Sequence, residues 1–413
     1  MAQSTSPMSA KRSAYFRLTI LAYAAIHVAV LRLFFVAGND IFLEQASAVF
    51  KGQLPYRDFI FEYPPLALAA LLPPRIFGSD STSYGNALGW EMLLLDVATL
   101  VLVALAARRL RIPVWQALGA YTAAMLTLGS LVVQRYDLLP ALLVTAALFC
   151  FTLRKYTLCW VLLALAVGAK LYPAVLVPLL ALYHFKRNDY ASLTRGITAF
   201  AVTVGITFIP WAILAPAGVR LSMEYQLGRG LQIETTYASA LMAGHTLGMT
   251  SLQVAFLHGA DDLVSPLATM LASASSFILP LALLATYAAY AATRPVAHAA
   301  PCVTESGLPD SRYMALFWSL SLAAFLLTGK VLSPQFLIWL IPLLALASGP
   351  LRWIPWVLIT IAAGLTHYIF PSHYYALMDF KGLAVGSLVT RNVLLVAIAL
   401  LLLKMGMARR DAQ

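Results

Sequence analysis

The sequence predicts an all-α integral membrane protein with about ten to thirteen transmembrane helices, and two observations predict it. The chain has 413 residues, of which 61% are hydrophobic and only 11% are charged, whereas a soluble globular protein carries about 25% charged residues. Its apolar residues fall in runs of bilayer length, with basic residues at the ends of the runs. Because a water-facing fold cannot bury so much apolar surface, we expect one polytopic domain over residues 15–407.

The net charge of +11 does not indicate a nucleic-acid partner. The basic residues are scattered in twos and threes at the ends of apolar runs, as membrane orientation requires. The three cysteines show neither a disulfide framework nor metal-ligand spacing. We therefore expect no metal and no cofactor. No cleavable signal pattern is seen, so the first apolar segment is expected to stay as an anchor.

The first span is expected at residues 15–37. Lys11 and Arg12 precede it, which places the N-terminus in the cytoplasm, and we expect residues 1–14 to be disordered there. The loop 38–66 then lies outside. Its first part has a helical period, with Phe42 and Ala46 on an apolar face, and predicts an interfacial helix.

Further crossings follow this loop, together with short segments that are expected to be re-entrant or interfacial. The expected spans lie near residues 86–107, 113–133, 138–151, 197–214, 267–291, 313–328, 336–348, 353–370 and 389–407. Between the spans at 138–151 and 197–214 lie two short apolar segments, which Lys170-Leu171-Tyr172-Pro173 separates. Such a break is tolerated only where it is buried in protein or lines a wet cavity.

Three further segments complete the expected organisation. Residues 237–264 are mixed and are expected to form an interfacial helix. Residues 294–312 are rich in Pro, Ala and Ser and predict a cytoplasmic linker. Residues 408–413 are expected to be a cytoplasmic C-terminus, since Arg409 and Arg410 end the chain inside.

Most acidic residues fall in the predicted outer loops, and any acid–base chemistry is expected there. Since nucleotide-activated substrates are absent outside the membrane, an enzyme there needs an activated group carried by a lipid. Transfer from a lipid phosphate needs a carboxylate that accepts a proton and cations that stabilise the departing phosphate. The outer loops supply both kinds: Asp40, Glu44, Asp58, Glu62 and Asp137, with Arg57, Arg135, Lys170, Arg229 and Lys330.

Five segments also resemble a known family. DIFLEQASAVFKGQLPYRDFIFEYPPL, at residues 40–66, resembles the first outer loop of the GT-C polytopic glycosyltransferases, and more narrowly of glycosyltransferase family 87, the polyprenol-phosphate-mannose-dependent mannosyltransferases. RYDLLPALL, GAKLYPAVLVPLL, RGLQIETTYAS and GKVLSPQFLIWLIPLL are similar to later segments of that family and follow in its order. The resemblance covers roughly residues 35–350. It implies a catalytic aspartate just after the first span, here Asp40, and an inverting single displacement without a nucleotide sugar.

The expected function is therefore transfer of a hexose, by the resemblance mannose, from a polyprenyl-phosphate donor. The acceptor is expected to be a hydroxyl of a lipid- or glycan-linked molecule on the extracytoplasmic face of the cell membrane. The partners are thus the lipid-linked donor, this acceptor and membrane lipid, with no nucleic acid. Expected roles are a general base for Asp40, phosphate contacts for Lys170, Arg229 and Lys330, acceptor contacts for Asp58 and Glu62, and a structural role inside the cavity for Asp137.

These residues also have structural alternatives. Glu62 fits a helix N-terminus, where negative charge is favoured. Asp137 fits an interface salt bridge with Arg135, and Lys330 fits an ordinary loop position. Asp40 fits a helix N-cap, and Asp58 fits an ion pair with its neighbour Arg57. Arg229 fits a pair with Glu234, and Lys170 fits a lysine that reaches up to the interface. We expect Asp96, an acid inside an apolar run, to form hydrogen bonds across helices.

Two other classes of protein compete with the enzyme. A transporter or flippase of lipid-linked sugars also has broken helices and cations in a cavity, but predicts an internal repeat, and the loop 38–66 has no counterpart in residues 200–413. An inactive assembly subunit is the third class. It predicts that Asp40→Asn leaves the phenotype intact.

Overall fold

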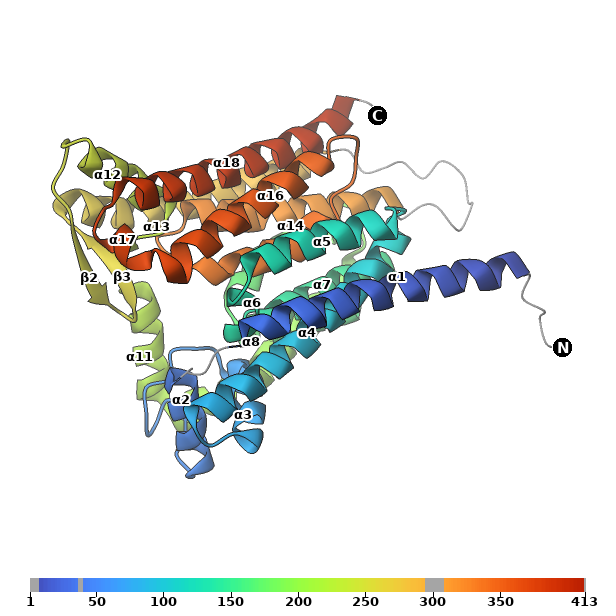
Figure 1. The fold of residues 1–413 in the computed structure, drawn as a ribbon. Helices are drawn as coiled ribbons and strands as arrows, with labels where there is room; N and C mark the ends of the chain where they lie inside the picture. The colour runs from blue at the N-terminus through green and yellow to red at the C-terminus, as the bar shows by residue number, and fades with distance from the viewer. Residues whose placement is uncertain (1–6, 36–39, 294–307, 412–413) are drawn as a thin grey trace.

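The structure is a computed structural model that describes residues 7–35, 40–293 and 308–411. Helices form nearly all of it and run alongside one another in an elongated bundle (Figure 1), which confirms the all-α fold class. The N-terminal helices are α1 (Pro7–Leu31), η1 (Arg32–Phe34), α2 (Asp40–Phe50), η2 (Pro65–Ala67), α3 (Leu68–Phe77), α4 (Ser81–Arg109), α5 (Val114–Leu128), α6 (Leu131–Gln134), α7 (Leu138–Thr152), α8 (Tyr156–Ala169), η3 (Tyr172–Leu176) and α9 (Val177–Lys186).

The C-terminal part continues the bundle and adds a small sheet. Its helices are α10 (Tyr190–Leu214), α11 (Pro216–Leu227), α12 (Thr236–Thr246), α13 (Pro266–Ala292), α14 (Leu308–Thr328), η4 (Pro334–Phe336), α15 (Leu337–Ala345), α16 (Trp353–His367), η5 (Tyr368–Ser372), α17 (Tyr374–Met378) and α18 (Gly382–Asp411). The strands are β1 (Leu231–Gln232), β2 (Gln253–Leu257) and β3 (Ala260–Val264), and they form an antiparallel sheet in the order β1-β3-β2.

Among the described residues, seven helices are long and apolar enough to cross a membrane. They lie at Ser13–Phe34, Ser81–Arg109, Tyr190–Leu214, Pro266–Ala292, Asp310–Thr328, Trp353–Ser372 and Gly382–Ala408. Four shorter apolar helical segments lie at Pro65–Phe77, Leu138–Thr152, Tyr156–Ala169 and Pro334–Ala345. Seven and four make eleven, so the expected number of membrane helices is reached only when the short segments are included.

The ends of several elements differ from the expectation. α1 begins at Pro7, inside the segment 1–14 that the sequence predicts to be disordered, whose residues 1–6 lie outside the described residues. Proline is favoured at a first helical position, and the Met, Ala, Lys and Arg that follow are good helix formers. α18 likewise runs into the predicted tail 408–413, because adding a turn to an existing helix is easy.

The predicted linker 294–312 is described only in its last part. α14 begins there, at Leu308, and residues 294–307 lie outside the described residues. The second crossing also begins before its expected start near residue 86, because the Asp80 side chain accepts hydrogen bonds from the backbone N–H groups of Thr82 and Ser83 at 3.1 and 3.0 Å. These bonds cap α4 at Ser81.

The segment 237–264 differs from the single interfacial helix that the sequence predicts. It contains α12 from its second residue to its end at Thr246, and then a β-hairpin, β2 and β3. His258 and Gly259 join the strands, with φ of +48° and +67°, as a two-residue hairpin turn requires. Helical periodicity is a poor guide here, because strands of five residues are too short to show their own period clearly.

The helices α1, α4 and α5 are joined by a buried polar network. Asp96 Oδ2 lies 2.5 Å from His27 Nδ1, and the Tyr121 hydroxyl donates to Asp96 Oδ1 at 2.7 Å. The other ring nitrogen of His27 lies 2.8 Å from the Thr122 hydroxyl. This confirms that Asp96 bonds across helices.

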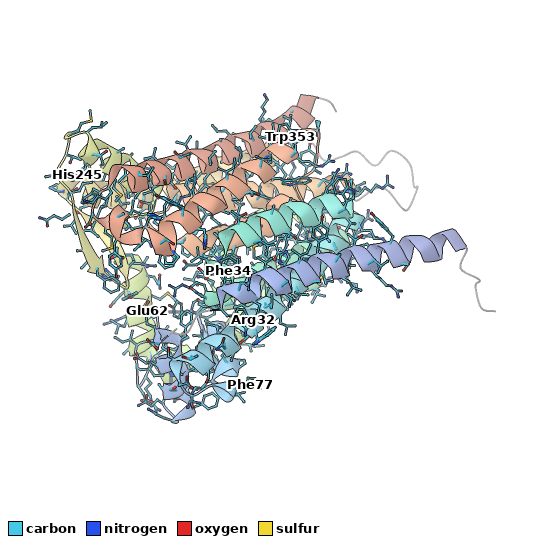
Figure 2. All side chains as sticks on the ribbon, in the orientation of Figure 1. Arg32, Phe34, Glu62, Phe77, His245 and Trp353 are labelled. Atoms are coloured by element: carbon cyan, nitrogen blue, oxygen red, sulfur yellow. The ribbon has the colours of Figure 1, made fainter. Side chains whose placement is uncertain are left out.

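The arrangement of the bundle separates its two ends. α1 begins and α18 ends at the same end, whereas α2, α3, α11 and the hairpin β2–β3 lie at the other end (Figure 1). Glu62 lies at the end that carries α2, and Trp353, at the start of α16, lies far from it (Figure 2). Glu62 thus lies at the end of the bundle opposite to the start of α1 and the end of α18.

Candidate functional site

Lys170 lies at the break between α8 and η3, as the sequence predicts. Its backbone is extended, with φ −159° and ψ 142°, so α8 ends at Ala169. The Nζ donates to Asp137 Oδ1 at 2.6 Å, and the two side chains are 16% and 1% exposed. Asp137 precedes α7 but does not cap it with its side chain, and its carboxylate therefore remains available to Lys170.

Aromatic rings surround this ion pair. Nζ of Lys170 lies 4.9 Å from the centre of the Tyr136 ring and 5.2 Å from the centres of the Phe336 and Trp339 rings. The indole N–H of Trp339 also donates to Asp137 Oδ1, at 2.7 Å. Contacts between a cation and aromatic faces stabilise a desolvated charge. The Lys170 ammonium is thus held in place within a largely apolar wall.

Glu62 forms the second part of the candidate site. Its backbone carbonyl accepts a hydrogen bond from Gln226 Nε2 at 3.0 Å, which ties the first outer loop to α11. Burial raises the pKa of the Glu62 carboxyl, while a hydrogen bond from the Tyr225 hydroxyl and the charge of Arg229 oppose the rise. The charge of Arg229 therefore acts on the Glu62 carboxyl.

Tyr63 joins the two parts. Its ring centre lies 5.3 Å from that of Tyr136 and 5.9 Å from that of Phe42 on α2. Burial raises the pKa of the Tyr63 hydroxyl. The charges that also act on this pKa are those of Glu62 and Asp137, which add to the rise, and of Arg135 and Arg229, which oppose it. The charges of four groups of the candidate site thus act on this one partly buried side chain.

Lys330 and Asp262 hold the segment that carries Arg229. The Nζ of Lys330 donates to the carbonyl of Leu227 at 2.7 Å, and the N–H of Gly230 donates to Asp262 Oδ2 at 3.1 Å. Burial lowers the pKa of the Lys330 ammonium, with the nearby Asp262 opposing this. The described contact of Lys330 is therefore with the backbone of this segment.

Asp40 begins α2 and is exposed. The residues just before it, 36–39, lie outside the described residues. Two positions later the buried Phe42 packs against both Tyr63 and Tyr136, with ring centres 5.9 Å from each. This packing holds the first turn of α2 against the aromatic wall, while Asp40, two residues before Phe42, lies on the exposed face of the helix.

Asp58 lies apart from these residues in its described contacts. It forms two hydrogen bonds of 2.9 Å with Arg57 and accepts one from the Leu54 N–H at 2.7 Å. This pairing lowers the pKa of the Asp58 carboxyl. The structural alternative, an ion pair with Arg57, is thus confirmed for Asp58.

The alternative pairing of Arg229 with Glu234 is wrong, because Glu234 pairs with Arg391 of α18 instead.

The residues that sequence reasoning missed are mainly aromatic, namely Tyr63, Tyr136, Tyr225 and Trp339. Tyr63 and Tyr136 each stand directly beside a charged residue at the edge of an apolar run, and this signal was available in the sequence. Among the described residues, no group of three or more His, Cys, Asp and Glu could hold a metal ion.

Comparison with known families decides the identity of the chain. The sequence model of glycosyltransferase family 87 matches residues 61–308, which is more than half of the sequence. The chain belongs to glycosyltransferase family 87. The predicted family is therefore confirmed, and this family 87 protein is a membrane glycosyltransferase.

Two crystal structures of ArnT from Cupriavidus metallidurans are similar to the family 87 chain. The structure bound to undecaprenyl phosphate is 15% identical, with 95% of this chain and 78% of that chain covered and a TM-score of 0.51. The apo structure is 12% identical, with 94% and 76% covered and a TM-score of 0.46. The first likeness shows the fold, which is of the predicted GT-C type. No curated protein matches the sequence significantly.

Proposed function

We propose that this family 87 enzyme transfers a hexose, specifically mannose, from a polyprenyl-phosphate-sugar donor to a hydroxyl of a lipid- or glycan-linked acceptor. The observation that carries the proposal is the Lys170 ammonium, which lies within a wall of aromatic rings, with the charge of Arg229 acting on the nearby Tyr63 and Glu62. A lipid phosphate needs this combination of positive charge and apolar surface. The undecaprenyl phosphate bound to the similar ArnT structure supports a polyprenyl lipid as partner.

The donor phosphate is assigned to Lys170 and Arg229. A lysine ammonium has three N–H donors, and the Asp137 contact at 2.6 Å uses one of them. The remaining donors can bind phosphate oxygens while Asp137 and the rings hold the group in place. Lys330 supports this site indirectly, since it binds the carbonyl of Leu227, two residues before Arg229.

Asp40 is the proposed general base. It is the first residue of α2 and is exposed, so an acceptor hydroxyl can reach its carboxylate. In the transfer, the acceptor oxygen forms a bond to the anomeric carbon while the bond from that carbon to the phosphate oxygen breaks. The electron pair leaves with polyprenyl phosphate, and Asp40 takes the hydroxyl proton. One displacement inverts the configuration at the anomeric carbon.

Glu62 is the proposed acceptor contact, and Asp58 is reassigned to its surface turn. Glu62 is partly buried between the first outer loop and α11, where its carboxylate can accept a hydrogen bond from a sugar hydroxyl. Asp58 is already occupied by Arg57 and the Leu54 N–H. Its contribution is therefore to the shape of the loop.

The site is proposed to face the outside of the cell membrane. Basic residues flank the first span at its start and the last at its end, and the bundle places these two ends together (Figure 1). Basic residues favour the cytoplasmic side, so the opposite end, with Asp40 and Glu62, would be extracytoplasmic.

The decisive experiment measures transfer from radiolabelled polyprenyl-phosphate sugars by the purified protein. Wild type is compared with Asp40→Asn, with mannose, glucose and arabinose donors. We expect transfer of mannose by wild type alone, and unchanged binding of polyprenyl phosphate by both proteins. Equal turnover by the two proteins would reject Asp40 as the base. Turnover with another sugar only would reject mannose.

Sidedness and the rival transporter class need separate measurements. A cysteine that replaces the exposed Lys51, just after α2, should react with an impermeant thiol reagent from outside intact cells. Labelling only after the membrane is opened would contradict the orientation. Movement of a lipid-linked sugar across vesicles without any transfer product would instead favour a flippase.

A further inference from the structure

A buried ion pair joins the last helix to the segment that carries Arg229. Arg391 of α18 and Glu234, just after β1, are both fully buried. Arg391 Nη1 lies 3.5 Å from Glu234 Oε2, and Nη2 donates to the Glu234 carbonyl oxygen at 2.6 Å. Burial raises the pKa of the Glu234 carboxyl to about 7, and the charge of Arg391 opposes that rise.

The neighbouring Asn392 extends this contact. Its Nδ2 donates to the carbonyl oxygens of Glu234 and Thr235 at 3.3 and 3.2 Å. Two successive backbone carbonyls therefore point at α18. Buried carbonyls need donors, so this stretch of backbone depends on the side chains of α18 for its conformation.

The opposite side of the same segment is bound to the candidate site. The N–H of Gln232 donates to the carbonyl of Lys330 at 3.1 Å, and the N–H of Ile233 donates to the carbonyl of Asp261 at 3.0 Å. The N–H of Gly230 reaches Asp262, as described above. Residues 230–235 thus lie between the site loops and α18, and Arg229 directly precedes them.

An ionisable side chain inside a membrane helix is costly and is functional by default. A hydrophobic pair would fill the space between α18 and this segment at least as stably, because buried ion pairs give little net stability. Arg391 does what an apolar residue cannot, since one guanidinium donates a hydrogen bond to the backbone carbonyl of Glu234 and forms an ion pair with its carboxylate. The contact therefore fixes the position of residues 230–235 relative to α18, in addition to packing them against it.

We propose that Arg391 is a positioning residue for sugar transfer, which acts through Glu234 to hold Arg229 at the donor phosphate. The inference rests on the proposed phosphate contact of Arg229. Arg391 itself touches no reacting atom. Its removal lets residues 230–235 move away from α18, and Arg229 then loses its alignment with the phosphate.

The test compares Arg391→Met, which removes the charge and all donors, with Arg391→Lys, which keeps the charge and a donor. The first readout is backbone amide hydrogen exchange in residues 230–235, which needs no activity. The second is the KM and kcat for the polyprenyl-phosphate-sugar donor. We expect faster exchange and a loss of about 10- to 100-fold in kcat/KM for Arg391→Met, with partial recovery of both in Arg391→Lys.

The matched control is His27→Gln. It damages an equally buried polar contact, with Asp96, on α1 and α4, which pack against each other and against α5. It should lower thermal stability but leave the exchange of this segment and the donor KM unchanged. If the control changes both as much as Arg391→Met does, or if Arg391→Met changes neither, the positioning role is refuted and the pair is purely structural.

Two further outcomes keep the test informative. Where Arg391→Met does not fold, Asn392→Ala removes two donations but keeps the ion pair, and a smaller change in the same direction is expected. Unchanged exchange in that variant would count against the proposal. If wild type transfers no sugar while Arg391→Met still loosens residues 230–235, the proposed function falls and the structural coupling stands.

Discussion

Replacing Lys170 by methionine tests the proposed phosphate contact most directly. Methionine fills a similar volume and keeps contact with the Tyr136, Phe336 and Trp339 rings, but has no charge and no donor. The Lys170 side chain is only 16% exposed and Asp137 only 1%. The substitution therefore acts on stability and on donor binding, and the two effects must be separated.

The size of each effect follows from the contacts. Removing one partner of a buried ion pair destabilises by about 3–5 kcal/mol, and we expect the lower end, since the Trp339 N–H still donates to Asp137. A hydrogen bond from a charged group to phosphate contributes about 1.5–3 kcal/mol. At 1.36 kcal/mol for each factor of ten, kcat/KM should fall about 10- to 150-fold.

The assay uses a double variant to separate these effects. Lys170→Met with Asp137→Asn removes both charges, so no unpaired carboxylate remains buried. Thermal unfolding in detergent should show recovery of stability relative to Lys170→Met, while kcat/KM for the polyprenyl-phosphate-sugar donor stays low. A double variant with nearly wild-type kcat/KM would refute the reasoning, because Lys170 would then serve only to neutralise Asp137.

Three further predictions use the same transfer assay. Arg229→Gln should lower kcat/KM for the donor about 10- to 150-fold, whereas Arg220→Gln, an exposed residue of α11, should stay within about twofold; similar losses in both would indicate a nonspecific charge effect. Burial raises the pKa of the Glu62 carboxyl, so lowering the pH through that pKa should protonate the carboxyl. Glu62 then competes less with the donor phosphate for Arg229. The KM of the singly charged donor should then fall as pH falls, and Glu62→Gln should abolish this dependence; a pH dependence retained in Glu62→Gln would contradict it. Asp58→Asn should change transfer less than about twofold, since exposed ion pairs such as that with Arg57 contribute little, and a large loss would restore Asp58 to the acceptor site.

The sequence predicted the fold class and the special status of Lys170 for sound physical reasons. A charge between two short apolar segments is too costly to leave in lipid, and α8 indeed ends directly before it. The same reasoning identified Asp96 as a residue that bonds across helices. These features depend on local polarity alone, which a single sequence displays.

The partners of these residues could not be predicted, because they are distant along the chain. Lys170 and Asp137 are 33 positions apart, and Trp339 is 202 positions from Asp137. Arg391 stood near the predicted outer end of the last span, where a basic residue is unremarkable. Only the packing of α18 shows that it is fully buried against Glu234.

The contact between Asp137 and Lys170 has a consequence for the turnover cycle. The carboxylate is a resident counter-ion, 2.6 Å from the ammonium. With the phosphate contact proposed for Lys170, an arriving phosphate would share an already neutralised cation, and a departing one would leave the ammonium paired with Asp137. The electrostatic free energy of Lys170 would thus differ little between the lipid-bound and lipid-free states. A small difference allows the anionic product, polyprenyl phosphate, to be released in each cycle.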